Sequence, residues 1–283
     1  MHKYVFHNDR IVALNEVRLS PGQAGLLNGW GTFTTFRIYA GRPFAFERHW
    51  KRLTTDARRI QLPMPFEPEA VRKHLDELLA ANQVSDGCVR LYFIYNKIGL
   101  WASDEGFPVT DLLMCSGDRP KRAGPADLTV RPHGRQAAHP LSNVKVISWL
   151  HNVWAVEQAH QQGFEEALLL NERNEVAECT AANVFSVRGG AVTTPPLESG
   201  CLPGVSREVL LELGPRNGLP IGEATLTMDD LGAADEIFIT STTREVQPIR
   251  RIDDLRMPQA PGPVTERLVG LFSDYVATYI GKH

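Results

Sequence analysis

Short apolar runs separated by turn residues make up the first part of the chain. Two of these runs flank Asn8-Asp9 and two more flank Ala40-Gly41-Arg42, which is typical of β-hairpins. The predicted strands are residues 4–7, 10–15, 33–39, 43–46, 89–95 and 111–115. The apolar spacing changes twice to the helical period, and the predicted helices are residues 47–59 and 67–83. The pattern therefore predicts a compact α+β unit.

The rest of the chain uses the same two periods. The predicted strands are residues 127–131, 165–170, 175–178, 183–187 and 236–240, and the predicted helices are residues 148–162, one that begins at Ser206, and residues 264–280. Residues 117–125 combine prolines, glycines and charges without apolar periodicity. We therefore expect a two-domain α+β or α/β fold, with a small N-terminal domain at 1–118, a linker at 119–125 and a larger domain at 126–283.

Composition narrows the class of partner. Of the 283 residues, 43% are hydrophobic and 22% are charged, and the formal net charge is -3, so no basic field for nucleic acid is expected. No apolar run has the length of a membrane span, and the chain does not open on a signal-peptide pattern, which favours a cytoplasmic protein with a small-molecule partner and no membrane partner. The four cysteines lack a C-x-x-C pair, so neither a disulfide framework nor a metal site is expected.

A lysine inside an apolar run is the first chemical signal. Lys145 stands in Asn143-Val-Lys-Val-Ile, which we interpret as a strand. Loss of hydration in such a setting disfavours the ammonium and lowers its pKa, which is the condition for forming a Schiff base with pyridoxal phosphate. The alternative is an edge-strand lysine that extends its amine into water.

A carboxylate in a second apolar run complements this lysine. Glu178 lies between Ala177 and Cys179, ahead of Ala181-Ala-Asn-Val-Phe185. A charge in such surroundings needs a partner, and a pyridinium nitrogen would serve, because the carboxylate keeps the ring protonated. The alternative is a structural ion pair.

Two turns are suited to a phosphate group. Leu202-Pro-Gly-Val-Ser-Arg207 is a glycine turn that leads into a helix, so the N–H groups of Val205 and Ser206 would point at an anion, although Ser206 could be only an N-cap. The second turn, Ser241-Thr242-Thr243, follows a buried strand and offers hydroxyls and amides. An ordinary ST-turn is the alternative there.

In this order, the features resemble the class IV, or fold type IV, pyridoxal-phosphate enzymes. These are the branched-chain and D-amino acid aminotransferases and the aminodeoxychorismate lyases. The matching pattern is a lysine, a helix, an acidic-Ala-Leu run and a glutamate ahead of Asn-x-Phe. The segments that carry it are Lys145, Val156-Glu-Gln-Ala159, Glu165-Glu-Ala-Leu-Leu-Leu170 and Glu178 to Phe185.

The resemblance implies a pyridoxal 5'-phosphate cofactor between a small N-terminal and a larger C-terminal domain, usually in a homodimer. Lys145 is similar to the Schiff-base lysine that shuttles the proton, Glu178 to the partner of the pyridine nitrogen, and Arg52 to an arginine that reaches the phosphate. The phosphate turns are matched by Val205, Ser206, Ser241, Thr242 and Thr243. The implied activity is ping-pong transfer of an amino group from an amino acid or amine donor to a 2-oxo acid acceptor.

The sequence indicates the substrate less directly than the cofactor. The candidates for substrate binding are Phe33, Thr35, Arg37 and Arg90. Either arginine could hold a donor carboxylate, although strand alternation could turn either one to solvent. Leu150 stands where branched-chain enzymes carry a tyrosine, and the D-amino acid aminotransferases resemble this chain better at that point. Those enzymes normally have a tyrosine where Phe33 stands, however, so the stereochemistry of the donor stays open.

Two other functions stay open beside the aminotransferase that we favour. Phe33-Thr34-Thr35 is similar to lyases that release 4-aminobenzoate and pyruvate, in which a threonine hydroxyl would assist proton transfer. The phosphate turns instead resemble those of the aminotransferases. A non-catalytic binding protein on the same fold is the third possibility, and the presence of both Lys145 and Glu178 opposes it.

Overall fold

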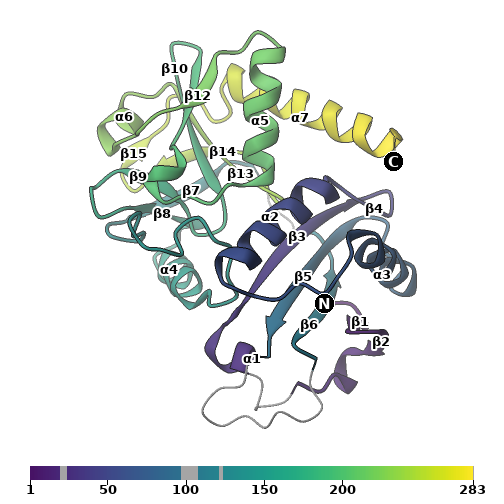
Figure 1. Ribbon diagram of the computed structural model, residues 1–283. Coiled ribbons are helices and arrows are strands. Elements are labelled where there is room, and N and C mark those ends of the chain that lie inside the picture. The colour runs from purple at the N-terminus through teal and green to yellow at the C-terminus, as the bar shows by residue number, and fades with distance from the viewer. Residues whose placement is uncertain (20–23, 97–107, 121–123, 283) are drawn as a thin grey trace. The chain divides into compact units, whose positions relative to one another are not determined.

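Two compact units make up the protein. The computed structural model describes residues 1–19, 24–96, 108–120 and 124–282. Unit 1 comprises residues 1–120, 144–149 and 279–283, and unit 2 comprises residues 121–143 and 150–278. Each unit has its own sheet (Figure 1). Each also has its own apolar core.

Unit 1 is built on an antiparallel sheet with the strand order β2-β1-β6-β5-β3-β4. Its strands are β1 (Tyr4–His7), β2 (Arg10–Ala13), β3 (Gly31–Tyr39), β4 (Arg42–Pro43), β5 (Gly87–Tyr95) and β6 (Thr110–Gly117). Its helices are η1 (Leu14–Glu16), α1 (Ala24–Asn28), α2 (Phe46–Arg59) and α3 (Pro68–Ala81). Because side chains alternate along a strand, one face of β3 carries Thr34 and Phe36 and the other carries Phe33, Thr35 and Arg37.

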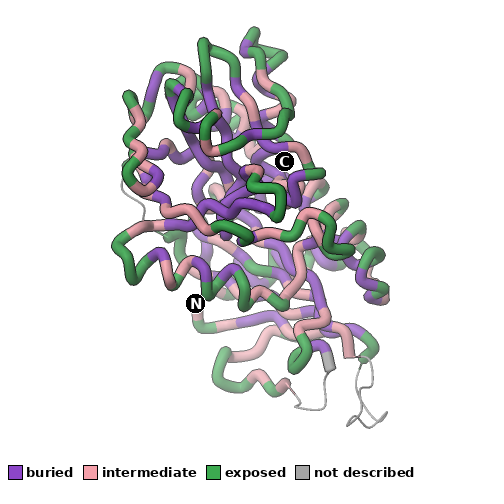
Figure 2. Tube along the Cα trace, turned by 90° about the vertical axis from the view of Figure 1, so that its left-hand side faces the viewer, coloured by how far each residue is buried: buried purple, intermediate pink, exposed green. Residues whose placement is uncertain are grey.

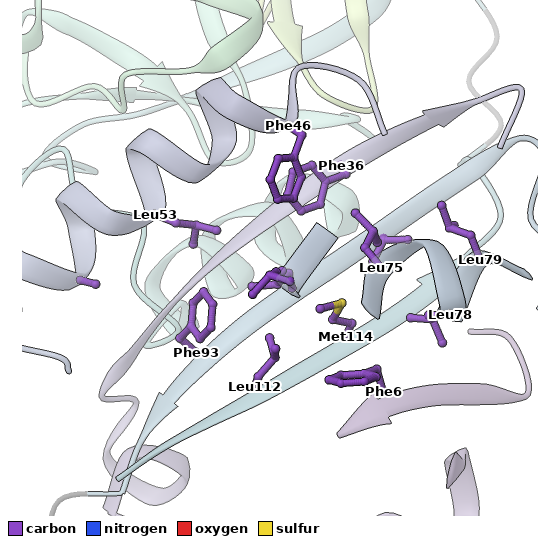
Figure 3. Close-up of a cluster of buried hydrophobic side chains, with 14 of the residues drawn as sticks. Phe6, Phe36, Phe46, Leu53, Leu75, Leu78, Leu79, Phe93, Leu112 and Met114 are labelled. Atoms are coloured by element: carbon purple, nitrogen blue, oxygen red, sulfur yellow. The ribbon is translucent and has the colours of Figure 1, made fainter. Parts of the chain in front are cut away.

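The core of unit 1 lies where α2 and α3 cover the sheet. Phe36 stacks on Phe46 of α2 with ring centroids 5.6 Å apart, and Leu75 of α3 is fully buried. Figure 3 shows these side chains together with Met114 from β6. The apolar positions of both helices recur at helical spacing, so folding buries one stripe of each helix against the strands.

Unit 2 has a mixed sheet with the strand order β12-β11-β10-β13-β14-β7-β8-β9, and β15 pairs with β14. Its strands are β7 (Ala126–Arg131), β8 (Glu166–Leu170), β9 (Val176–Cys179), β10 (Asn183–Arg188), β11 (Ala191–Thr194), β12 (Ile221–Glu223), β13 (Glu236–Ser241), β14 (Glu245–Ile252) and β15 (Leu255–Arg256). Its helices are α4 (Leu150–Gln161), η2 (Leu197–Ser199), α5 (Val205–Arg216), α6 (Met228–Gly232) and α7 (Pro263–Lys282), whose last residues are counted in unit 1. Strands β8, β9 and β13 are almost wholly buried. Buried segments of the chain are purple in Figure 2.

Residues 43–46 do not form the strand that the apolar run predicts. Strand β4 is limited to Arg42–Pro43, and α2 begins at Phe46 after a left-handed Ala45. The physical reason is that Phe46 faces the core as the first residue of a helical stripe and stacks on Trp50 one turn later, with centroids 6.2 Å apart.

A local pattern could not reveal that residues 144–149 belong with unit 1. They join it through non-local hydrogen bonds, such as the one that the Ile147 N–H donates to the Gly31 carbonyl at 3.0 Å. The larger domain predicted at 126–283 therefore does not describe this segment correctly. Of the predicted linker, residues 121–123 lie outside the described residues. Among the helices in the described ranges, none is long and apolar enough to cross a membrane.

The packing of α3 can be tested by removing one buried side chain. Leu75→Ala is expected to lower the free energy of unfolding by about 2–5 kcal/mol, because it leaves a cavity among fully buried neighbours. Lys73→Ala, at an exposed position of the same helix, should change it by less than about 0.5 kcal/mol. Denaturant unfolding of the two variants measures the difference, and equal losses would contradict the packing described.

Candidate active site

The main chain of Lys145 is fixed against the start of β3. Its carbonyl accepts a hydrogen bond from the Thr32 hydroxyl at 2.8 Å and another from the Phe33 N–H at 3.2 Å. The prediction of a strand here is wrong, because the segment makes only a single β-bridge, between Thr32 and Val146. The lysine thus lies in an irregular segment whose position is set by β3.

The amine of Lys145 lies beside aromatic rings of unit 1. Its Nζ is 4.4 Å from the centroid of the Phe33 ring and 5.8 Å from that of Trp149. Phe33 is also stacked on Tyr92 of β5, with centroids 5.7 Å apart. The half-buried lysine side chain is therefore bordered by apolar surface on the same face of the sheet as Phe33.

Helix α2 brings the phosphate candidate Arg52 close to the lysine segment. Arg52 Nη2 donates to the hydroxyl of Thr34 at 2.9 Å, and that hydroxyl also hydrogen-bonds Nδ1 of His49 at 2.7 Å. One helical turn after Arg52, the Oδ2 of Asp56 accepts the Lys145 N–H at 3.3 Å. The lysine and the arginine are thus both tied to α2.

Two buried titratable groups of α2, Asp56 and His49, have shifted pKa values. Burial raises the pKa of Asp56 to about 6, although Arg52, the Lys145 N–H, Lys145 and Arg59 oppose the shift. Burial lowers the pKa of His49 well below its ordinary value, and the charges of Arg52 and Lys145 lower it further. His49 is therefore neutral near pH 7, and Thr34 is hydrogen-bonded to an uncharged imidazole.

The substrate candidates of β3 and β5 lie in one row. Thr35 pairs with Arg90 across the two strands, and Arg90 lies 6.0 Å from the centroids of both Phe33 and Trp149. Arg37 is engaged differently, because its guanidinium is buried and forms an ion pair with Asp86. It also donates to the carbonyls of Ile38 and Gly87.

Glu178 is a paired, buried carboxylate in unit 2. Its side chain is 8% exposed, and its Oε1 accepts from Arg135 at 2.9 Å. Its Oε2 accepts the N–H of Leu202 at 3.0 Å. Leu202 opens the predicted phosphate turn, so this bond joins the ring-nitrogen candidate to that turn.

The first phosphate turn ends at the N-terminus of α5. Helix α5 begins at Val205 with Ser206 second, and its N-cap, Gly204, provides no side-chain cap. A Cβ at Gly204 would collide with Oδ1 of Asn183, whose Nδ2 donates to the Leu202 carbonyl. The first N–H groups of this helix have no intrahelical partner, so they are available to an anion.

The second phosphate turn, Ser241 to Thr243, connects β13 to β14. It is closed by the Arg244 N–H, which donates to the carbonyl of Ser241 at 3.2 Å and to its hydroxyl at 3.3 Å. Thr240, which precedes the turn, pairs with Asn183 across β10 and β13. Asn183 therefore contacts the first turn and the residue that precedes the second, and unit 2 contains Glu178 and both phosphate candidates.

Known proteins are similar to this chain in sequence and in fold. A family model, Amino-transferase class IV, matches residues 31–252. A D-alanine aminotransferase of Listeria innocua is 31% identical over 98% of each chain, and an aminodeoxychorismate lyase of Bacillus subtilis is 27% identical over 98% of this chain and 96% of its own. A solved branched-chain amino acid aminotransferase from T.th., with pyridoxamine 5'-phosphate, is 25% identical, covers 99% of this chain and 95% of that one, and gives a TM-score of 0.89.

The chain therefore belongs to the class IV aminotransferase family. The family and the fold class predicted from the sequence are confirmed, and so is the prediction of an enzyme. This family depends on pyridoxal phosphate. The described residues fit such a group, because they offer an uncapped helix N-terminus for a phosphate and a buried carboxylate for a ring nitrogen.

The sequence missed several residues that hold the candidates in place. They are His49, Asp56, Arg135, Trp149 and Asn183. Asp56 could have been found, because it lies four residues after Arg52 and so on the same face of α2. Arg135 carries no comparable signal, since its partners are distant in the chain, whereas Asn183 lies in the matching Asn-x-Phe pattern but was given no role.

The raised pKa of Asp56 predicts a stability that falls as pH rises. Between the pKa of the unfolded chain, near 3.8, and that of the folded protein, about 6, the folded form binds more protons. The stability of the wild type relative to Asp56→Asn should therefore fall by up to about 3 kcal/mol from pH 4 to pH 7. Denaturant unfolding of cofactor-free protein across this range measures it. Asp76→Asn, at an exposed position of α3, is the control, and a flat difference for Asp56→Asn would refute the assignment.

Proposed function

We propose that the protein is a pyridoxal 5'-phosphate-dependent aminotransferase that moves an amino group between an amino acid, or an amine, and a 2-oxo acid by a ping-pong mechanism. The observation that carries this proposal is the placement of Lys145, whose main chain is bound by β3 and α2 and whose amine lies beside Phe33 and Trp149. The relatives of this protein include D-alanine and branched-chain aminotransferases, which supports amino-group transfer as the class of reaction.

Lys145 is proposed to attach the cofactor and then to move the substrate proton. When bound, pyridoxal phosphate supplies the electron sink that allows the bond from the substrate α-carbon to its hydrogen to break. Once displaced by an amino donor, Nζ of Lys145 would take this proton from the α-carbon as a general base and deliver it to the C4′ carbon of the cofactor as a general acid. The rings of Phe33 and Trp149 lie beside Nζ and restrict the positions that the amine can take.

The other candidates are proposed to bind and orient the cofactor. The carboxylate of Glu178 would hold a proton on the pyridine nitrogen, and Arg135 keeps that carboxylate in place. Arg52 and the two turns would bind the phosphate. These assignments rest on the resemblance of the motifs and on the local geometry within each unit.

Arg90 is the better candidate for the donor carboxylate. It lies in the same row as Thr35 and shares Phe33 and Trp149 as neighbours with Lys145, whereas the guanidinium of Arg37 is engaged with Asp86 and two carbonyls. Arg37 is therefore proposed to stabilise the sheet. We also carry the family expectation of a homodimer as a proposal.

A half-reaction distinguishes the aminotransferase from the lyase. Purified protein mixed with D-alanine, L-alanine, glutamate or an aryl-ethylamine should convert to the pyridoxamine spectrum with at least one donor, and Lys145→Ala should show no conversion. Stopped-flow absorbance measures the change. No conversion with any donor, together with pyruvate release from aminodeoxychorismate, would establish the lyase instead. The pyruvate assay is included because an aminodeoxychorismate lyase of Bacillus subtilis is 27% identical to this chain.

Substituting Arg90 tests the carboxylate assignment. Arg90→Met should raise KM for amino acid donors by about tenfold or more, because a charge-assisted hydrogen bond is lost. KM for an aryl-ethylamine, which has no carboxylate, should change by less than about twofold. Arg58→Met, at an exposed position of α2, is the control in steady-state kinetics. An equal rise in KM for amine and amino acid would show that Arg90 does not read the carboxylate.

A further inference from the structure

Arg244, the residue that ends the Ser241–Thr243 turn, is buried and strongly engaged. Its side chain is 3% exposed, and its guanidinium donates to two carboxylates in succession along the chain. Nη1 donates to Oε1 of Glu165 at 2.6 Å, and Nη2 donates to Oε2 of Glu166 at 3.1 Å. Nη1 also donates to the side chain of Gln247. None of these contacts is accounted for by the roles assigned above.

Glu166 is an acceptor that cannot move. Its carboxylate is 1% exposed, and its Oε1 accepts the Ala167 N–H at 3.0 Å, the Thr180 N–H at 3.3 Å and the Thr180 hydroxyl. A buried carboxylate that accepts this many hydrogen bonds is held in one orientation. A guanidinium that spans Glu165 and Glu166 is therefore held at a fixed point, and with it the end of the turn.

The topology explains why these groups meet. Strands β8 and β14 both run parallel to β7, so β8 and β14 begin at the same edge of the sheet. Glu166 is the first residue of β8, and Arg244 directly precedes β14. Gln247 completes the link by donating to the Gly124 carbonyl just ahead of β7.

The same hydrogen bonds continue to Glu178. The Thr180 carbonyl accepts from Nδ2 of Asn152, whose Oδ1 accepts from Nη1 of Arg135 at 3.1 Å, and Arg135 donates to Glu178. The phosphate turn and the ring-nitrogen carboxylate are thus the two ends of one hydrogen-bonded chain inside unit 2. Such a chain can keep two parts of a binding site at a constant separation.

We propose that Arg244 is a positioning residue for the cofactor phosphate: by binding Glu165 and Glu166 it holds the Ser241–Thr243 turn in the conformation that accepts a phosphate group. This inference rests on the proposed function, because it presumes that the turn binds the phosphate of pyridoxal phosphate. Arg244 acts through the turn, since both terminal nitrogens of its guanidinium are occupied by protein acceptors. Loss of Arg244 should therefore weaken recognition of the phosphate and leave recognition of the ring unchanged.

The test compares two cofactor forms that differ only in the phosphate. Cofactor-free protein is titrated with pyridoxal 5'-phosphate and, separately, with pyridoxal, and the absorbance change gives a Kd for each. For Arg244→Met we expect the Kd of the phosphorylated form to rise by roughly tenfold or more and that of pyridoxal to change by less than about twofold. Arg250→Met, an exposed arginine on β14 that is paired with Asp127, is the matched control and should change neither Kd.

Two further variants separate positioning from charge. Arg244→Lys keeps the positive charge but cannot bridge two carboxylates, so it should also lose affinity for the phosphorylated form. In a double-mutant cycle, Arg244→Met combined with Glu166→Gln should lose little more than Arg244→Met alone, because the two residues act as one unit. If Arg244→Met fails to fold, Arg244→Lys decides. Wild-type affinity in Arg244→Lys would overturn the positioning role.

The remaining outcomes are distinguishable from failure of the proposed function. Wild-type protein that takes up neither compound would refute the cofactor proposal itself. Wild-type protein that prefers the phosphorylated form, with the same preference retained in the Arg244 variants, would refute only the role of Arg244. Equal losses of affinity for both forms would show that Arg244 supports the fold of unit 2 and not the phosphate turn.

Discussion

The main-chain hydrogen bonds of Lys145 are the constraint on which the rest of the unit 1 site depends. A lysine has a long, flexible side chain, and without a fixed backbone its amine would sample many positions. Here its carbonyl is held by Thr32 and Phe33 and its N–H by Asp56. The aromatic neighbours of Nζ, the arginine on α2 and the row of substrate candidates are all placed relative to this one short segment.

Adjacent threonines on β3 show how alternation divides two similar residues between different tasks. Thr34 is fully buried and binds Arg52 and His49, so its hydroxyl has two partners in the fold. Thr35 lies on the opposite face, in the row of Phe33 and Arg90. If a hydroxyl assists proton transfer, the geometry favours Thr35, because the hydroxyl of Thr34 is already hydrogen-bonded to Arg52 and His49.

The sequence predicted those parts of the fold and site that depend on local pattern. Most helices, the long strands of unit 1 and the turn into α5 follow from apolar spacing and from glycine and proline positions. Strand β14 was missed because Pro248 interrupts its pattern, and prolines are rare within strands. Lys145 and Glu178 stood out by their unusual surroundings. Arg135 and the pairing of Arg244 with Glu166 did not, because side chains whose partners are distant in the chain have no local signature.

The assignment of residues 144–149 to unit 1 has a consequence for how the polypeptide can be divided. The chain passes from one unit to the other four times, after residues 120, 143, 149 and 278. No single cut therefore separates the units. A fragment that stopped at residue 120 would retain β3 but lose the segment that is hydrogen-bonded to Gly31 and Thr32. Such a fragment would lack Lys145. The segments of the two units alternate along the polypeptide, so unit 1 obtains Lys145 only from a chain that continues past residue 143.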